Sequence, residues 1–121
     1  MAKSDDGNII AQKSFTFALR IIKAYKYLTE HNEYILSKQL LRSGTSIGAN
    51  CREAKNAQSR LDFINKLNIA LKEADETAYW LELLHEGGFI DKISYESIHN
   101  DCVELIKLLT SIVKKTKESP N

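Results

Sequence analysis

Apolar residues recur at steps of three and four positions through four stretches of the chain, a spacing that places them on one face of an α-helix. In the first stretch, from about residue 14 to 31, this face carries Phe17, Ala18, Ile21, Ile22, Tyr25 and Leu28. In the third, a 3.5-residue repeat typical of packed helices runs through Ile64, Leu67, Leu71, Ala74, Ala78, Leu81 and His85. The fourth shows the same rhythm at Ile98, Cys102, Leu105, Leu109 and Ile112.

The second stretch begins near Glu33 or Tyr34 and contains a run of small residues at positions 43–49, with Gly44 and Gly48 among them. Each glycine disfavours a helix by roughly 1 kcal/mol relative to alanine. The helical spacing nevertheless continues across the run, at Leu40, Gly44, Ile47, Cys51 and Ala54. We therefore predict one long helix whose small residues let a neighbouring backbone approach closely.

The expected helix ends follow from cap residues. Ser59 and Ser94 are good N-caps, and Gly87-Gly88 provides a stop, because glycine accepts the left-handed conformation that ends many helices. Short connections favour antiparallel neighbours. We therefore predict an all-α fold, an antiparallel up-down-up-down four-helix bundle over residues 13–115, with flexible tails at residues 1–12 and 116–121. One proline and five glycines agree with few turns.

The length of 121 residues suits one domain. No apolar run approaches the ~18 residues of a membrane span, and the polar first seven residues lack the apolar segment of a signal peptide. We therefore expect a cytoplasmic protein with no membrane partner. In that reducing compartment, Cys51 and Cys102 are expected to be buried thiols rather than a disulfide.

Charge is distributed unevenly along the chain although the formal net charge is only +1. Residues 1–60 carry a net charge of +5, and residues 61–121 carry −4. Such a split indicates either a surface that faces a polyanion or charge-complementary packing between halves or subunits. Both interpretations remain open at this point.

Basic residues gather on the first two predicted helices. By helical geometry, Lys38, Arg42 and Arg52 fall within about 80° of one another. A surface of this kind would position a nucleic-acid backbone without reading sequence. The candidate phosphate-binding residues are Arg20, Lys23, Lys26, Lys38, Arg42, Arg52, Lys55 and Arg60. The alternative interpretation is a solvated basic surface.

The third predicted helix carries more apolar residues than one bundle core can use. Trp80 and Leu83 point about 150° away from its core face by the 100° rule, and Tyr79 adjoins them. An exposed tryptophan there would promote aggregation of a monomer. We therefore expect Tyr79, Trp80 and Leu83 to lie in the interface of a homo-oligomer, unless a chain terminus covers them.

No arrangement of residues predicts catalysis. His31, His85 and His99 lie in three separate segments, and the lone Glu82-x-x-His85 pair lacks the second copy that four-helix di-iron sites use. Residues 43–48 have the composition of a phosphate loop but not its order, and no strand precedes them. We therefore expect neither an enzyme nor a metal or cofactor site.

Three segments together are distinctive: LRSGTSIGAN at 41–50 followed by REA at 52–54, DFINK at 62–66, and IALKEADET at 69–77 leading into YWLELL at 79–84. In these segments the chain resembles the 23S ribosomal RNA intervening-sequence proteins, over about residues 12–115. The resemblance implies a bundle that assembles into a ring-shaped homopentamer without established catalytic residues. A related branch, the accessory protein of diversity-generating retroelements, binds nucleic acid through a basic surface and partners a reverse transcriptase.

These observations lead to two hypotheses of function. The first is a non-enzymatic helical homo-oligomer that binds the backbone of RNA or DNA through its first two helices. The second is a structural or protein-interaction scaffold, with no nucleic-acid binding, whose charges serve packing. Phosphate contacts weaken steeply with salt, so salt-dependent binding to RNA distinguishes the two.

Overall fold

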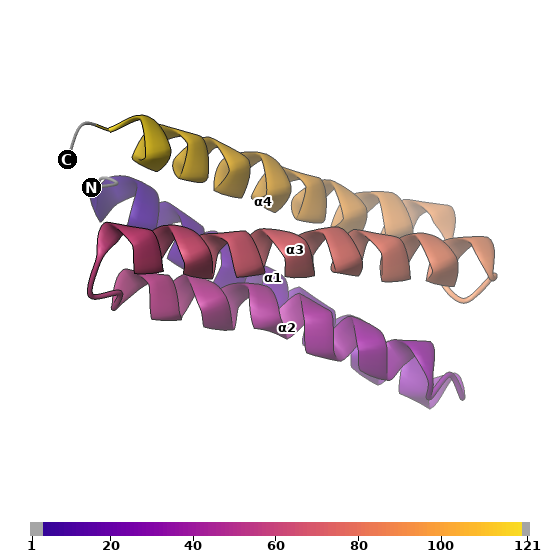
Figure 1. The fold of residues 1–121 in the computed structure, drawn as a ribbon. Helices are drawn as coiled ribbons and strands as arrows, with labels where there is room; N and C mark the ends of the chain where they lie inside the picture. The colour runs from indigo at the N-terminus through magenta and orange to yellow at the C-terminus, as the bar shows by residue number, and fades with distance from the viewer. Residues whose placement is uncertain (1–3, 120–121) are drawn as a thin grey trace.

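The computed structural model describes residues 4–119 and is all-α, with no strand among those residues (Figure 1). Its four helices are α1 (Ser4–Glu30), α2 (Leu36–Lys55), α3 (Arg60–Glu86) and α4 (Lys92–Glu118). Each helix packs against the next along the chain, and α1 also contacts α4, the sparsest of these contacts. The helices α1 and α3 therefore occupy diagonally opposite corners of a four-helix arrangement. No helix within residues 4–119 is long and apolar enough to cross a membrane.

The predicted ends of α3 are confirmed, whereas α4 begins earlier than predicted. The Ser59 hydroxyl accepts the Asp62 backbone N–H at 3.0 Å, and Gly88 adopts a φ of +86° just beyond the helix. At α4 the cap is Asp91 rather than Ser94, because the Asp91 carboxylate accepts the backbone N–H of Ser94 at 2.8 Å. Ser94 therefore lies inside the helix, one turn after the cap.

The first and last helices of the chain, α1 and α4, extend into regions that we expected to be tails. The helix α1 begins at Ser4, and Ile10, seven positions before Phe17 on the same face, is buried in the core. At the other end, α4 continues to Glu118, and Thr116 is buried. Residues 4–12 and 116–118, which we expected to belong to flexible tails, are therefore part of helices in the structure, and Ile10 and Thr116 pack within the bundle. Residues 1–3 and 120–121 lie outside the described residues.

The small residues of α2 allow close packing against α1, and α2 is one continuous helix as predicted. A Cβ atom added at Gly44 would lie 2.6 Å from Cγ1 of Ile21, which is fully buried. At Gly48 it would lie 3.3 Å from the backbone oxygen of Ser14. Side chains at these two positions would push the helices apart.

Capping also defines the start of α2, two to three residues later than predicted. The Glu33 carboxylate accepts backbone N–H groups of Ile35, Leu36 and Ser37 at 3.2, 3.0 and 2.6 Å. In return, the Ser37 hydroxyl donates to the Glu33 backbone oxygen at 2.8 Å. This buried glutamate therefore satisfies donors that the first turn of a helix leaves free.

Candidate nucleic-acid interface

Arg20, a candidate phosphate-binding residue on α1, is engaged with α4. Its guanidinium donates to the carboxylate of Asp101 at 2.6 Å and to the hydroxyl of Ser97 at 3.0 Å. Nearby, the Lys13 ammonium lies 3.2 Å from Glu104. Basic residues of α1 thus pair with acidic residues of α4.

Arg42 is likewise engaged, in this case between α2 and α3. It donates to Glu73 at 3.2 Å and to Glu76. The Trp80 indole N–H also donates to Glu76, at 3.3 Å. Arg60 donates to the backbone oxygen of Ser119 at 2.7 Å, which ties the start of α3 to the end of α4.

These contacts favour charge-complementary packing as the explanation for part of the uneven charge. Three basic residues of the N-terminal half, Lys13, Arg20 and Arg42, pair with acidic residues of the C-terminal half. In one pair the halves are reversed, because Lys66 of the C-terminal half lies 2.9 Å from Glu53 of the N-terminal half. Because these side chains are partly exposed, such pairs contribute little to stability.

The other five candidates form no ion pair among residues 4–119 and are exposed to solvent. They are Lys23 and Lys26 on α1, and Lys38, Arg52 and Lys55 on α2. Since α1 and α2 pack side by side, the five cations share one half of the bundle. The structure therefore divides the candidate set into residues held by packing and residues available to a partner.

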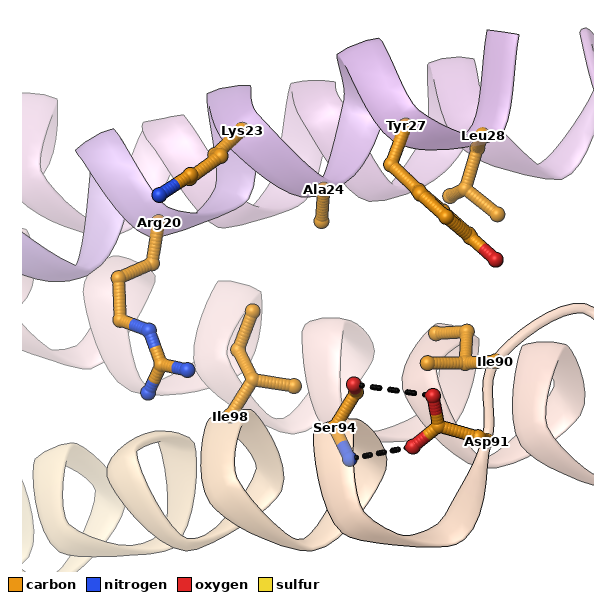
Figure 2. A pocket seen from close by; sticks show the side chains of 9 residues that line it. All are labelled: Arg20, Lys23, Ala24, Tyr27, Leu28, Ile90, Asp91, Ser94 and Ile98. Carbon is orange, nitrogen blue, oxygen red and sulfur yellow. Dashed lines mark hydrogen bonds between the residues drawn. The ribbon is translucent and has the colours of Figure 1, made fainter. Parts of the chain in front are cut away.

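A pocket of about 220 Å³ lies between α1 and the start of α4 (Figure 2). Ala24, Leu28, Ile90 and Ile98 give it apolar walls. Figure 2 shows Arg20 and Lys23 toward one end, the Tyr27 ring reaching across from α1 toward Ile90 at the other, and Ser94 with Asp91 along α4. Sequence reasoning identified only the two cations, because the pocket forms between segments about 70 residues apart.

The candidate interface residues on α3 differ in exposure. Tyr79 and Leu83 are exposed, at 54% and 36%, whereas Trp80 packs partly against the core. The Tyr79 and Trp80 rings meet edge to face at a centroid distance of 5.2 Å. Trp80 therefore already has intramolecular partners, and Tyr79 and Leu83 form the freer part of this surface.

A second exposed apolar surface, which sequence reasoning missed, lies on α1. Phe15, Leu19 and Ile22 are 55%, 53% and 38% exposed. Their spacing at positions i, i+4 and i+7 was the available signal. The assignment of Ile22 to the buried face is wrong, because one step of about 100° from buried Ile21 turns it outward.

Both cysteines are buried, and His85 and His99 lie against neighbouring side chains. Burial raises the pKa of the Cys51 thiol to about 11 and that of the Cys102 thiol to about 12. The His85 ring stacks on Tyr95 at 4.5 Å, and Nε2 of His99 lies 3.4 Å from the Glu82 carboxylate. No group of three or more His, Cys, Asp or Glu side chains that could hold a metal ion occurs in the described part of the chain.

Comparison with known proteins agrees with the fold. A crystal structure of a protein with unknown function, from the S23 ribosomal protein family of Bacteroides thetaiotaomicron VPI-5482, is 61% identical in sequence, with a TM-score of 0.89. The match covers 90% of this chain and 98% of that chain. No curated protein gives a significant match. The family model for the 23S rRNA-intervening sequence protein matches residues 7–111, and the chain belongs to this family.

Proposed function

We propose that this protein is a non-enzymatic homo-oligomer of antiparallel up-down-up-down four-helix bundles that binds the backbone of RNA or DNA through α1 and α2. The supporting observation is the set of five exposed cations on these helices that form no ion pair among residues 4–119. A nucleic-acid backbone is the ligand that such a set fits best, because each phosphate contact releases a condensed counterion.

The proposed surface has a suitable extent. From Lys38 to Lys55, α2 advances about 26 Å at 1.5 Å per residue, and Arg52 lies between them. Glu53, the acidic residue inside this span, is paired with Lys66 of α3. A nucleic-acid strand along α2 would therefore meet cations near both ends of the helix and little opposing charge between them.

Repetition of this surface in an oligomer would strengthen binding. We propose that the exposed apolar surface of α3, which includes Tyr79 and Leu83, packs against the surface of Phe15, Leu19 and Ile22 on α1 of the next copy. Because α1 and α3 lie at opposite corners of the bundle, this contact joins two different surfaces and closes into a ring when the rotation permits. The homopentamer expected from the family resemblance is such a ring, and it would present its cations multivalently.

The alternative is a scaffold for protein partners, such as a reverse transcriptase, with no nucleic-acid binding. The ion pairs of Arg20 and Arg42 support it, because they use part of the positive charge within the bundle. This interpretation predicts no retention of RNA at ~50 mM salt.

Binding to a mixed-sequence RNA, measured by fluorescence anisotropy over a range of salt concentrations, tests the proposal. We expect the double substitution Lys38→Glu and Arg52→Glu to lower affinity at least about tenfold and to reduce the salt slope by about 0.7 per lost contact. The matched control is Lys107→Glu with Lys114→Glu on α4, which changes net charge equally at two exposed positions. No binding by the unsubstituted protein, or equal loss in both variants, would contradict a site on α2.

Sedimentation of the Leu83→Asp variant tests the assembly. A buried carboxylate at the α1–α3 contact should dissociate the oligomer, because a desolvated unpaired charge is strongly unfavourable. Ile93→Asp is the control, since this side chain is 83% exposed at the start of α4 and outside both surfaces. If the Leu83→Asp variant forms an oligomer of the same mass as the unsubstituted protein, α3 does not form the interface.

A further inference from the structure

The pocket between α1 and α4 places apolar walls, an aromatic ring and a carboxylate beside Lys23, one of the five cations of the phosphate-binding proposal. Its volume of about 220 Å³ is below the ~300–1,000 Å³ of pockets for drug-sized ligands. It therefore suits one ring system rather than a whole nucleotide or a larger cofactor. Its apolar walls come from three parts of the chain, α1, the α3–α4 connection and α4.

Polar side chains lie at the two opposite ends of these apolar walls. Lys23 lies at one end and forms no ion pair among residues 4–119. At the other end lie the Asp91 carboxylate and Tyr27, a half-exposed residue whose ring packs against the His31 ring at a centroid distance of 4.1 Å. The Asp91 carboxylate accepts hydrogen bonds from the Ser94 backbone and hydroxyl, at 2.8 and 3.2 Å, and retains further acceptor capacity.

We propose that this pocket takes a single unstacked base of a single-stranded nucleic acid, with the base against Tyr27 and its phosphate at Lys23. Aromatic side chains and apolar walls receive the faces of splayed bases in single-strand recognition. The Asp91 carboxylate accepts from an amino or ring N–H group on the edge of the base. This inference rests on the proposed function and adds to it a preference for single strands over duplexes.

Arg20 has a different role from Lys23 in this arrangement. Asp101 neutralises Arg20, and together with Ser97 it fixes the guanidinium as a rigid wall of the pocket. Lys23 carries a charge that is not compensated by any ion pair with residues 4–119 and sits on a flexible stem. Lys23 is therefore the phosphate contact, and Arg20 is a positioning residue.

Hydrogen bonding by Asp91 also favours a base over an apolar side chain of another protein. The hydrogen bond from the Ser94 backbone N–H lowers the pKa of Asp91, so the carboxylate is ionised at neutral pH. An ionised carboxylate beside the pocket gains a partner from a base edge, whereas an aliphatic side chain would offer it no donor.

Anisotropy with a labelled 12-nucleotide oligouridine and with an abasic strand of the same length tests the proposal, because the two strands carry the same phosphates. We expect the unsubstituted protein to bind the base-bearing strand about tenfold more tightly. Tyr27→Ala and the pocket-filling Ala24→Leu should abolish this preference, and neither should change the salt slope. Tyr27→Phe should retain it. Tyr34→Ala, at an exposed tyrosine between α1 and α2, is the matched control and should leave the preference intact.

The outcomes separate this inference from the proposed function. Equal affinity of the unsubstituted protein for both strands would overturn the base pocket and leave the phosphate surface intact. No binding of either strand would overturn both. Sedimentation of the Tyr27→Ala and Ala24→Leu variants measures the mass of the oligomer. If either variant is helical by circular dichroism but forms an oligomer of different mass, the pocket receives another copy of the chain, and the inference is wrong.

Discussion

The close approach of α1 and α2 at Gly44 leads to a quantitative prediction for Gly44→Ala. The added Cβ would lie 2.6, 2.8 and 2.9 Å from Cγ1, Cγ2 and Cδ1 of Ile21. All three distances are shorter than normal carbon contacts, and Ile21 is a β-branched, fully buried residue with little room to move. One of the two helices must therefore shift, or Ile21 must leave its rotamer.

Two opposing effects determine the size of the change. Overpacking a well-packed core costs about 1–3 kcal/mol, and three simultaneous short contacts place this case near the upper limit. Replacing glycine by alanine inside a helix stabilises it by about 1 kcal/mol. We therefore expect Gly44→Ala to lower the free energy of unfolding by about 2 kcal/mol, which corresponds to a decrease in Tm of roughly 6–10 °C for a chain of this size.

Urea denaturation followed by circular dichroism, at one protein concentration, measures this free energy. Gly7→Ala is the control, because Gly7 lies in α1 with nothing within 4 Å of the added Cβ, and it should be neutral or slightly stabilising. Ile21→Ala alone should cost about 2–5 kcal/mol. Combined with Gly44→Ala, it should cost at least ~1 kcal/mol less than the sum, because the two changes compensate in volume. A Gly44→Ala variant as stable as the unsubstituted protein would refute the packing argument.

Two further predictions concern buried groups. Burial raises the pKa of Cys51 to about 11 and that of Cys102 to about 12, so almost no thiolate is present at pH 8. Ellman's reagent should therefore react with the two thiols only after denaturant is added. Prompt reaction with the folded protein would contradict the burial of these thiols. The Thr77 and Ser43 hydroxyls lie 2.9 Å apart in the core, so Thr77→Val should destabilise by about 1–3 kcal/mol in urea, and adding Ser43→Ala should recover part of this loss.

The helical fold could be predicted because its main signals are local. The apolar spacing of α3 and the Ser59 cap depend only on residues within a few positions of one another. The continuity of α2 could be predicted because Gly44 lies on the apolar face, where the absence of a side chain allows the neighbouring helix to approach closely. The helix ends were less accurate where two signals competed. Asp91 and Ser94 are both good caps three residues apart, and sequence alone does not rank them.

The candidate site was predicted less completely because it depends on distant pairs. Arg20 meets Asp101 at a separation of 81 residues, and Arg42 meets Glu73 and Glu76 at separations of 31 and 34. A helical pattern indicates which face a residue occupies but not which acidic residue lies opposite it on another helix. The charge difference between the halves was visible in the sequence, whereas its division into paired and unpaired cations required the packed bundle.

The division into paired and unpaired cations reflects the different chemistry of arginine and lysine side chains. The planar guanidinium can donate to two acceptors at once, and Arg20 and Arg42 each use it to join two helices. Arg60 likewise bonds across helices, to Ser119. Arg52 is the one arginine of the chain whose side chain forms no ion pair or hydrogen bond within residues 4–119, whereas the other unpaired cations of α2, Lys38 and Lys55, are lysines. The guanidinium of Arg52 is therefore free to engage a ligand with paired acceptors, and the phosphate contact that we propose for α2 would supply them.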